Sequence, residues 1–78
     1  MGQIICSFDI ELRQPIPKER MSPDQRDTAI LKNADRVSVF WITENLRRAR
    51  LVTHLEKSGL LKLDHSCGYP WLKVKWEA

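Results

Sequence analysis

The sequence contains few of the residues on which several common kinds of site depend. Only three of its 78 residues are glycine, so it has no glycine-rich loop that could surround a phosphate with backbone amides. Its two cysteines, Cys6 and Cys67, follow no recognisable export signal, and we therefore expect both to be free, reduced thiols. A phosphate-binding loop and a disulfide-stabilised fold are both disfavoured.

Long hydrophobic runs are also absent. No stretch approaches the roughly 20 apolar residues of a membrane-spanning helix. The run Ile4-Ile5-Cys6 is too short for the hydrophobic region of a secretory signal. We therefore expect a cytoplasmic protein that has no membrane partner.

The charge is too nearly balanced to identify a partner. Thirteen Lys and Arg residues stand against ten Asp and Glu residues, which gives a net charge of +3. This excess permits nucleic acid or another acidic partner but does not require one. A chain that depended on phosphate contacts alone would usually be more basic.

The length and the overall composition indicate one small globular domain that spans residues 1–78. Apolar residues make up 42% of the chain and charged residues 29%, which is typical of a folded protein. A chain of this size buries only about 60–65% of the surface that it exposes when unfolded. Its core must therefore be small, and we do not expect a deep substrate cavity.

The N-terminal segment from Ile4 to Leu12 has the alternation of a half-buried β-strand. Ile4, Cys6, Phe8, Ile10 and Leu12 share one face, and polar residues occupy the other, with Ile5 as the exception. Two prolines follow within the sequence Gln14-Pro15-Ile16-Pro17, which predicts an extended connection to residue 21.

A helix is predicted to begin at Ser22-Pro23-Asp24-Gln25, because this sequence has the residues of a capping box with proline at the first helical position. Its end is ambiguous. Apolar residues continue at helical spacing as far as Trp41, yet Val37–Ile42 is rich in β-branched and aromatic residues, which favour a strand. We favour a continuing or second helix, with a buried strand as the alternative.

The C-terminal half is predicted to be a helix followed by a hairpin. Thr43 is the expected N-cap of a helix over Glu44–Ser58, and Gly59 is placed to terminate it. Residues 60–63 and 71–76 then form two strands around a turn that contains Gly68. The predicted fold is α+β, with a three-stranded antiparallel sheet (the N-terminal strand plus the C-terminal hairpin) covered on one face by two or three helices.

Residues 43–76 resemble the recognition helix and wing of winged helix-turn-helix DNA-binding domains. The resemblance rests on Leu55, Gly59, Leu60 and Leu61, which match the end of the recognition helix, and on the hairpin that follows. It implies that the exposed side of the helix enters a major groove. The DNA contacts implied for the helix are Arg47, Arg48, Arg50, Thr53 and His54, and those implied for the wing are Lys73 and Lys75.

The arginines of this set, and Trp71 beside its two lysines, each have an alternative interpretation. Arginines one turn into a helix oppose its dipole, which suggests that they serve a partner, but Glu44 and Arg48 could instead form an i, i+4 ion pair on a solvated face. Trp71 lies beside Lys73 and Lys75, where it could stack on bases or anchor a partner. The alternative is that Trp71 packs against a helix edge or a loop.

No pattern indicates metal binding or catalysis. His54, His65, Cys6 and Cys67 lack the paired spacing of a structural zinc site. Cys67 and His65 fall in a presumed exposed turn, with Asp64 as the only nearby acid and no implied pocket. We therefore expect no metal, no cofactor and no enzymatic activity.

Two functions fit these observations. The first is a small nucleic-acid-binding module, such as a regulator, with DNA favoured over RNA. The second is a protein-interaction module, such as an inhibitor or adaptor of the kind that phages and mobile elements encode, which would bind an acidic protein surface. The open edges of a three-stranded sheet would also allow a homodimer.

Overall fold

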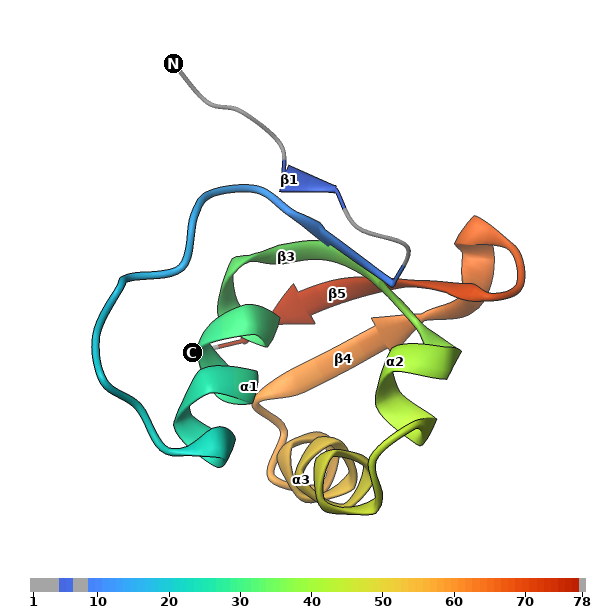
Figure 1. Cartoon of the computed structure of the whole chain (residues 1–78). Helices are drawn as coiled ribbons and strands as arrows, with labels where there is room; N and C mark the ends of the chain where they lie inside the picture. The colour runs from blue at the N-terminus through green and yellow to red at the C-terminus, as the bar shows by residue number, and fades with distance from the viewer. Residues whose placement is uncertain (1–4, 7–8, 78) are drawn as a thin grey trace.

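The computed structural model describes residues 5–6 and 9–77 and has the α+β class that the sequence predicts. In chain order its elements are β1 (Ile5–Cys6), β2 (Ile10–Leu12), α1 (Pro23–Asn33), β3 (Ala34–Ser38), α2 (Val39–Thr43), α3 (Leu46–Lys57), β4 (Leu61–Asp64), the 3₁₀ turn η1 (His65–Cys67) and β5 (Trp71–Trp76). The strands form one antiparallel sheet in the order β1-β2-β3-β5-β4. The α-helices lie on one side of this sheet (Figure 1).

The C-terminal hairpin is confirmed, but the prediction of three strands is wrong. Strands β4 and β5 pair from Leu61 with Trp76 to Asp64 with Lys73. The N-terminal segment and the hairpin are not neighbours, however, because β3 lies between β2 and β5. The described part of the sheet therefore has five strands.

The N-terminal segment is not one continuous strand. The chain reverses between β1 and β2, so that Ile5 pairs with Leu12 and Cys6 pairs with Glu11. Of the residues predicted for that strand, Ile4 and residues 7–8 lie outside the described part of the chain. A period of two residues shows which side chains share a face, but it does not show where the strand turns back.

The ambiguous segment Val37–Ile42 is divided between β3 and α2. A continuing helix is wrong, but a second helix is present from Val39, and the alternative of a buried strand holds for Val37 and Ser38. Helix α1 ends at Asn33, where the side-chain amide donates to the carbonyl of Ala29 at 2.9 Å. Val37 then pairs with Ile10 on one side and Leu72 on the other, and it is fully buried. The Ser38 side chain accepts the Phe40 amide and begins the short helix α2.

The helix caps are predicted correctly at α1 but not at the start of α3. The capping box of Ser22 and Gln25 is present. Helix α3 begins instead at Asn45, whose side chain accepts amides of the first turn, and the hydroxyl of Thr43 donates to the Val39 carbonyl within α2. Gly59 has a φ of +79°, a backbone conformation that favours glycine after a helix, so its predicted role is confirmed.

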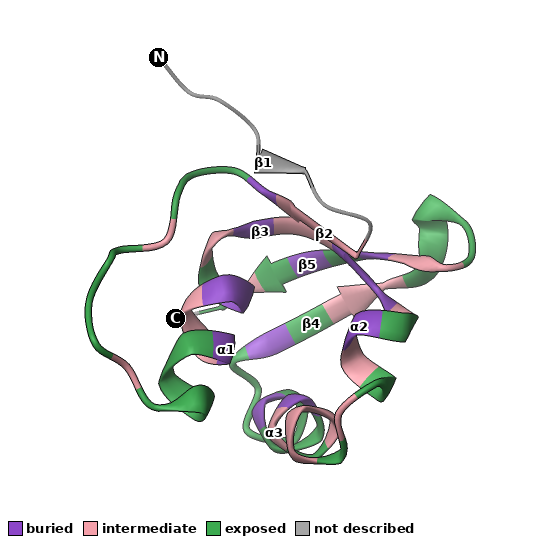
Figure 2. Ribbon diagram, in the orientation of Figure 1, coloured by how far each residue is buried: buried purple, intermediate pink, exposed green. Residues whose placement is uncertain are grey.

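The core lies between the sheet and the helical layer, where the buried residues of both gather (Figure 2). Strand β5 shows how this layer is built. Leu72 and Val74 are buried toward the helices, and Lys73 and Lys75 are exposed on the other side. The sheet therefore has one face in the core and one face open to solvent. The core residues are Leu12, Ile30, Leu31, Ala34, Val37, Trp41, Val52, Leu55, Leu61, Leu72 and Val74.

Candidate functional site

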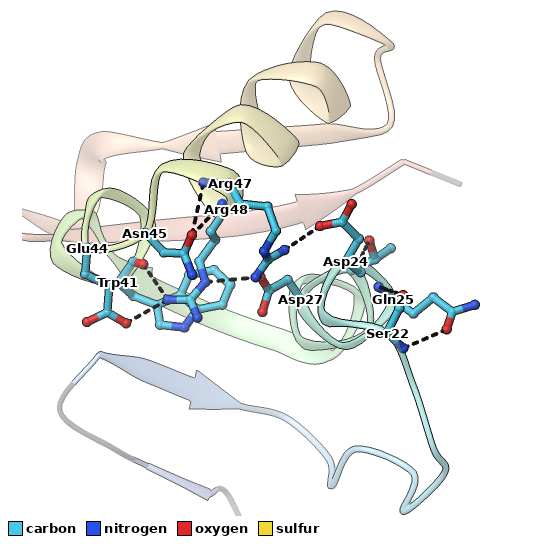
Figure 3. Close-up of polar contacts among 10 residues, drawn as sticks. Ser22, Asp24, Gln25, Asp27, Trp41, Glu44, Asn45, Arg47 and Arg48 are labelled. Carbon is cyan, nitrogen blue, oxygen red and sulfur yellow. Dashed lines mark hydrogen bonds and ion pairs between the residues drawn. The ribbon is translucent and has the colours of Figure 1, made fainter.

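Two arginines of the predicted contact set attach α3 to α1 (Figure 3). Arg47 donates from Nη2 to Asp27 Oδ2 at 2.7 Å and from Nη1 to the Asp24 carboxylate. Arg48 donates from Nε to the same Asp27 oxygen at 3.2 Å. The Asp27 side chain is only 4% exposed, so its charge is compensated by two guanidinium groups rather than by water.

Arg48 also attaches α3 to α2. Its Nη1 atom donates to the Trp41 carbonyl and to Glu44 Oε1, each at 2.7 Å, and its guanidinium lies 4.3 Å from the centroid of the Trp41 ring. The predicted i, i+4 pair with Glu44 is therefore confirmed, but Arg48 does not lie on the solvated face that this alternative assumed. The Arg48 side chain is 14% exposed, so most of it is unavailable to a partner.

Asp27 is the residue of this cluster that the sequence reasoning missed. A signal was present, because Asp27 precedes Ile30 by three residues and Leu31 by four, and these positions form the buried side of α1. A carboxylate on the apolar side of a helix requires a partner when it is buried. Arg47 and Arg48 are those partners, and the hydrogen bonds that Arg47 donates to Asp27 and then to Asp24 raise the pKa of Arg47 above its ordinary value.

The exposed side of α3 carries the other predicted residues of that helix. Arg50, Thr53 and His54 are exposed, and Arg50 makes no ion pair with any described residue. The Thr53 hydroxyl donates to the carbonyl of Ala49 at 2.9 Å. Two shallow hollows of about 440 and 500 Å³ flank this side of the helix, and Leu46, which is 66% exposed, lines both.

The predicted residues of β5 lie on the open face of the sheet, among further cations. We call this surface the basic sheet face and define it by Arg36, Lys62, Trp71, Lys73 and Lys75. Lys73 is directly opposite Arg36 on β3, and Lys75 is directly opposite Lys62 on β4. Both are pairs of like charge, which destabilise a sheet when the two residues face each other across neighbouring strands.

Arg36 and Lys62, which extend this face beyond β5, were not predicted from the sequence. Neither has a local sequence signal, because only strand pairing brings them beside β5. Lys62 lies 3.6 Å from Glu77, and both side chains are largely exposed, so this ion pair is weak. Lys73 has Arg36 opposite it on β3 and Asp64 opposite it on β4. The Asp64 side chain accepts the Ser66 amide at the start of η1.

Trp71 is half-buried at one end of the basic sheet face, beneath a fixed guanidinium group. Arg36 lies with its Cζ atom 5.0 Å from the centroid of the Trp71 ring. Two hydrogen bonds to Glu11, from Nη2 at 2.7 Å and from Nε at 3.2 Å, hold the guanidinium in place. The hydrogen bond from Arg36 lowers the pKa of Glu11 below its ordinary value.

This ion pair predicts a loss of stability in acid that Glu11→Gln should remove. Because the pKa of Glu11 is lower in the folded chain, its contribution is complete well above pH 4.5 and is lost as the pH falls through the folded-state pKa. Glu11→Gln should therefore be less stable than the wild type at pH 7, and the difference should shrink in acid. Urea unfolding across this pH range measures the effect, with Glu19→Gln on the exposed connection as the control. A difference that is constant with pH would contradict the prediction.

The structure divides the predicted contact residues between two sides of the molecule. Arg50, Thr53 and His54 lie on the outside of the helical layer, whereas Lys73 and Lys75 point away from that layer across the sheet. Arg47 and Arg48 lie between helices and maintain the fold. The exposed side of α3 and the basic sheet face are therefore two separate candidate surfaces.

Three further findings concern metal ions, thiols and membranes in the described part of the chain. No group of three or more His, Cys, Asp or Glu side chains lies close enough there to hold a metal ion. Cys67 is a free cysteine with an exposed side chain. Within the same part of the chain, no helix is long and apolar enough to cross a membrane.

Comparisons of this chain with models of protein families, with curated proteins and with solved structures found no match.

Proposed function

We propose that this chain is a small non-enzymatic nucleic-acid-binding module and that it holds phosphates on the basic sheet face. The observation that carries the proposal is the register of this face, in which Lys62 lies directly opposite Lys75, with Lys73 on the same side of β5. Cations placed directly across neighbouring strands repel each other, and a polyanion that lies over them removes the repulsion.

The surroundings of these cations also favour a phosphate ligand. Glu11 neutralises Arg36, which leaves three lysines that are exposed on two adjacent strands: Lys62, Lys73 and Lys75. Their flexible ammonium groups suit phosphate contacts that do not depend on base sequence. Trp71 adds an aromatic ring at the end of the same row, as nucleic-acid-binding sheets commonly do. We favour DNA over RNA as the ligand and a regulator as the role.

Nucleic-acid affinity should fall steeply as salt rises, and it should do so less steeply after Lys62→Ala/Lys75→Ala. Each lost lysine–phosphate contact reduces the slope of log K against log salt by about 0.7–0.9. The double variant should therefore lose about 1.5 from the slope. Titration of labelled DNA and RNA at low and moderate salt measures this.

A matched double variant controls for the change in net charge. Lys18→Ala/Arg20→Ala removes two exposed cations from the connection between β2 and α1, which is not part of the basic sheet face. We expect the salt slope of this control to stay close to that of the wild type. Equal losses in the two double variants would reduce the proposal to a general effect of net charge, and absence of binding at low salt would reject it.

One observation favours the second function, a module that binds an acidic protein surface. Leu46 is 66% exposed on α3 and lines two hollows, which Arg50 and His54 also line. An exposed leucine beside an unpaired arginine suits a protein partner better than a phosphate backbone. The titration above also decides between the two functions, because a protein-interaction module predicts no salt-dependent binding of DNA or RNA.

A further inference from the structure

We infer that the ligand of the basic sheet face is a single-stranded nucleic acid rather than a duplex. This inference rests on the proposed function and adds the form of the ligand. It depends on aromatic side chains at one end of β5, which the phosphate contacts do not use.

The first feature is the order of side chains along β5. Trp71, Lys73 and Lys75 alternate on the open face, so consecutive members are roughly 6.6–6.8 Å apart along the strand. This row has a ring at one end and ammonium groups beyond it. An extended strand of nucleic acid offers bases and phosphates separately, so it can place a base at the ring and phosphates at the lysines.

The second feature is the rigid stack formed by Arg36 and Trp71. Glu11 holds the guanidinium of Arg36 through two hydrogen bonds, and the guanidinium lies over the indole ring. Since Glu11 cancels the charge of Arg36, the stack offers flat surfaces more than net charge. Unpaired bases stack on aromatic rings and on guanidinium planes alike.

The third feature is a pair of exposed aromatic rings at the end of β5 that carries Trp71. Tyr69 is 80% exposed and Phe40 is 52% exposed, and their ring centroids lie 5.8 Å apart in an edge-to-face arrangement. The Val39 amide donates to the Pro70 carbonyl at 2.8 Å, which connects the start of α2 to the residue before Trp71. The two rings are therefore attached at the end of β5 that carries Trp71, rather than on a free loop.

These rings distinguish the two forms of nucleic acid. In a duplex the faces of the bases are covered by their neighbours in the stack, and a protein reaches only base edges and the backbone. The exposed rings of Tyr69 and Phe40 then add little to the affinity for a duplex. A single strand has free base faces, and each base stacked on an aromatic side chain adds roughly 1–3 kcal/mol, which corresponds to about a 5- to 150-fold gain in affinity.

The test compares oligo-dT and oligo-rU with a DNA duplex of the same length, by fluorescence anisotropy at one moderate salt concentration. We expect a single strand to bind roughly fivefold or more tightly than the duplex. Tyr69→Ala should remove at least a fivefold share of single-strand affinity and leave duplex affinity unchanged. Tyr69→Phe keeps the ring and should bind as the wild type does. Because Tyr69 is largely exposed, both variants should fold normally.

A second control and the alternative outcomes separate this inference from the proposed function. Leu46→Ala removes an exposed apolar side chain from α3 and should leave single-strand affinity unchanged. Equal binding of single strand and duplex, or full single-strand affinity in Tyr69→Ala, would overturn the inference. The proposed function would survive that result if Lys62→Ala/Lys75→Ala still weakened both ligands. Absence of binding to every nucleic acid would reject both.

Discussion

Replacing Asp27 with alanine should lower the free energy of unfolding by about 3 kcal/mol or more. The Asp27 carboxylate is 4% exposed and accepts hydrogen bonds from both Arg47 and Arg48. Its removal leaves Arg48, whose side chain is 14% exposed, without its acidic partner on α1. Arg48 keeps its bonds to Glu44 and to the Trp41 carbonyl, but its guanidinium loses one acidic partner and keeps its cost of desolvation, which dominates the expected loss. Urea unfolding monitored by tryptophan fluorescence measures it.

The matched control is Asp24→Ala, which removes a carboxylate from the same network at its exposed end. Asp24 pairs with Arg47, but its side chain is 59% exposed, so water replaces the lost contact. We expect a loss of less than about 1 kcal/mol. Similar losses in the two variants would show that burial of Asp27 does not determine its contribution. Far-ultraviolet circular dichroism of Asp27→Ala at low temperature establishes whether the variant still folds.

Replacing Leu31 with alanine should cost about 3–5 kcal/mol of stability. Leu31 is fully buried on the inner side of α1, where it packs in the core between the helices and the sheet. The substitution removes apolar surface from the core and leaves a cavity that the surrounding side chains only partly fill. A 78-residue domain has a total stability of roughly 4–12 kcal/mol, so the substitution should remove a quarter or more of it.

The control for Leu31→Ala is Leu46→Ala, the same chemical change on a helix but at a position that is 66% exposed. Since Leu46 is already in water for the most part, its truncation should change stability by no more than about 0.5 kcal/mol. Thermal unfolding of the two variants and the wild type under identical conditions gives the comparison. Equal losses would contradict the assignment of Leu31 to the core and Leu46 to the surface.

The arginines of α3 show why composition alone identifies a binding surface poorly. Arg47, Arg48 and Arg50 form one cluster in the sequence, but two of them pair with acids of α1 and α2 and one does not. The difference follows from the helical rotation of 100° per residue. This rotation turns Arg47 and Arg48 toward neighbouring helices and Arg50 toward solvent.

Several features depend only on residues within a few positions of one another, so the local sequence determined them. The capping box at Ser22, the glycine after α3 and the hairpin of β4 and β5 were all predicted correctly. A cap requires a side chain within three residues of the amide that it accepts. A positive φ depends on the residue that adopts it. The alternation of Leu72 and Val74 with Lys73 and Lys75 likewise shows directly which side of β5 is buried.

Only the tertiary structure decided the division of Val37–Ile42 and the composition of the basic sheet face. Val37 joins a strand because β2 and β5 supply its hydrogen-bond partners from residues 10–12 and 71–73, and no local preference contains that information. Arg36, Lys62 and Lys73 lie far apart in the sequence, and strand pairing alone makes them neighbours. The sequence by itself determined the start of α1, the glycine that follows α3, the C-terminal hairpin and the buried side of β5. The contacts between distant segments determined which charges are compensated inside the fold and which remain on its surface.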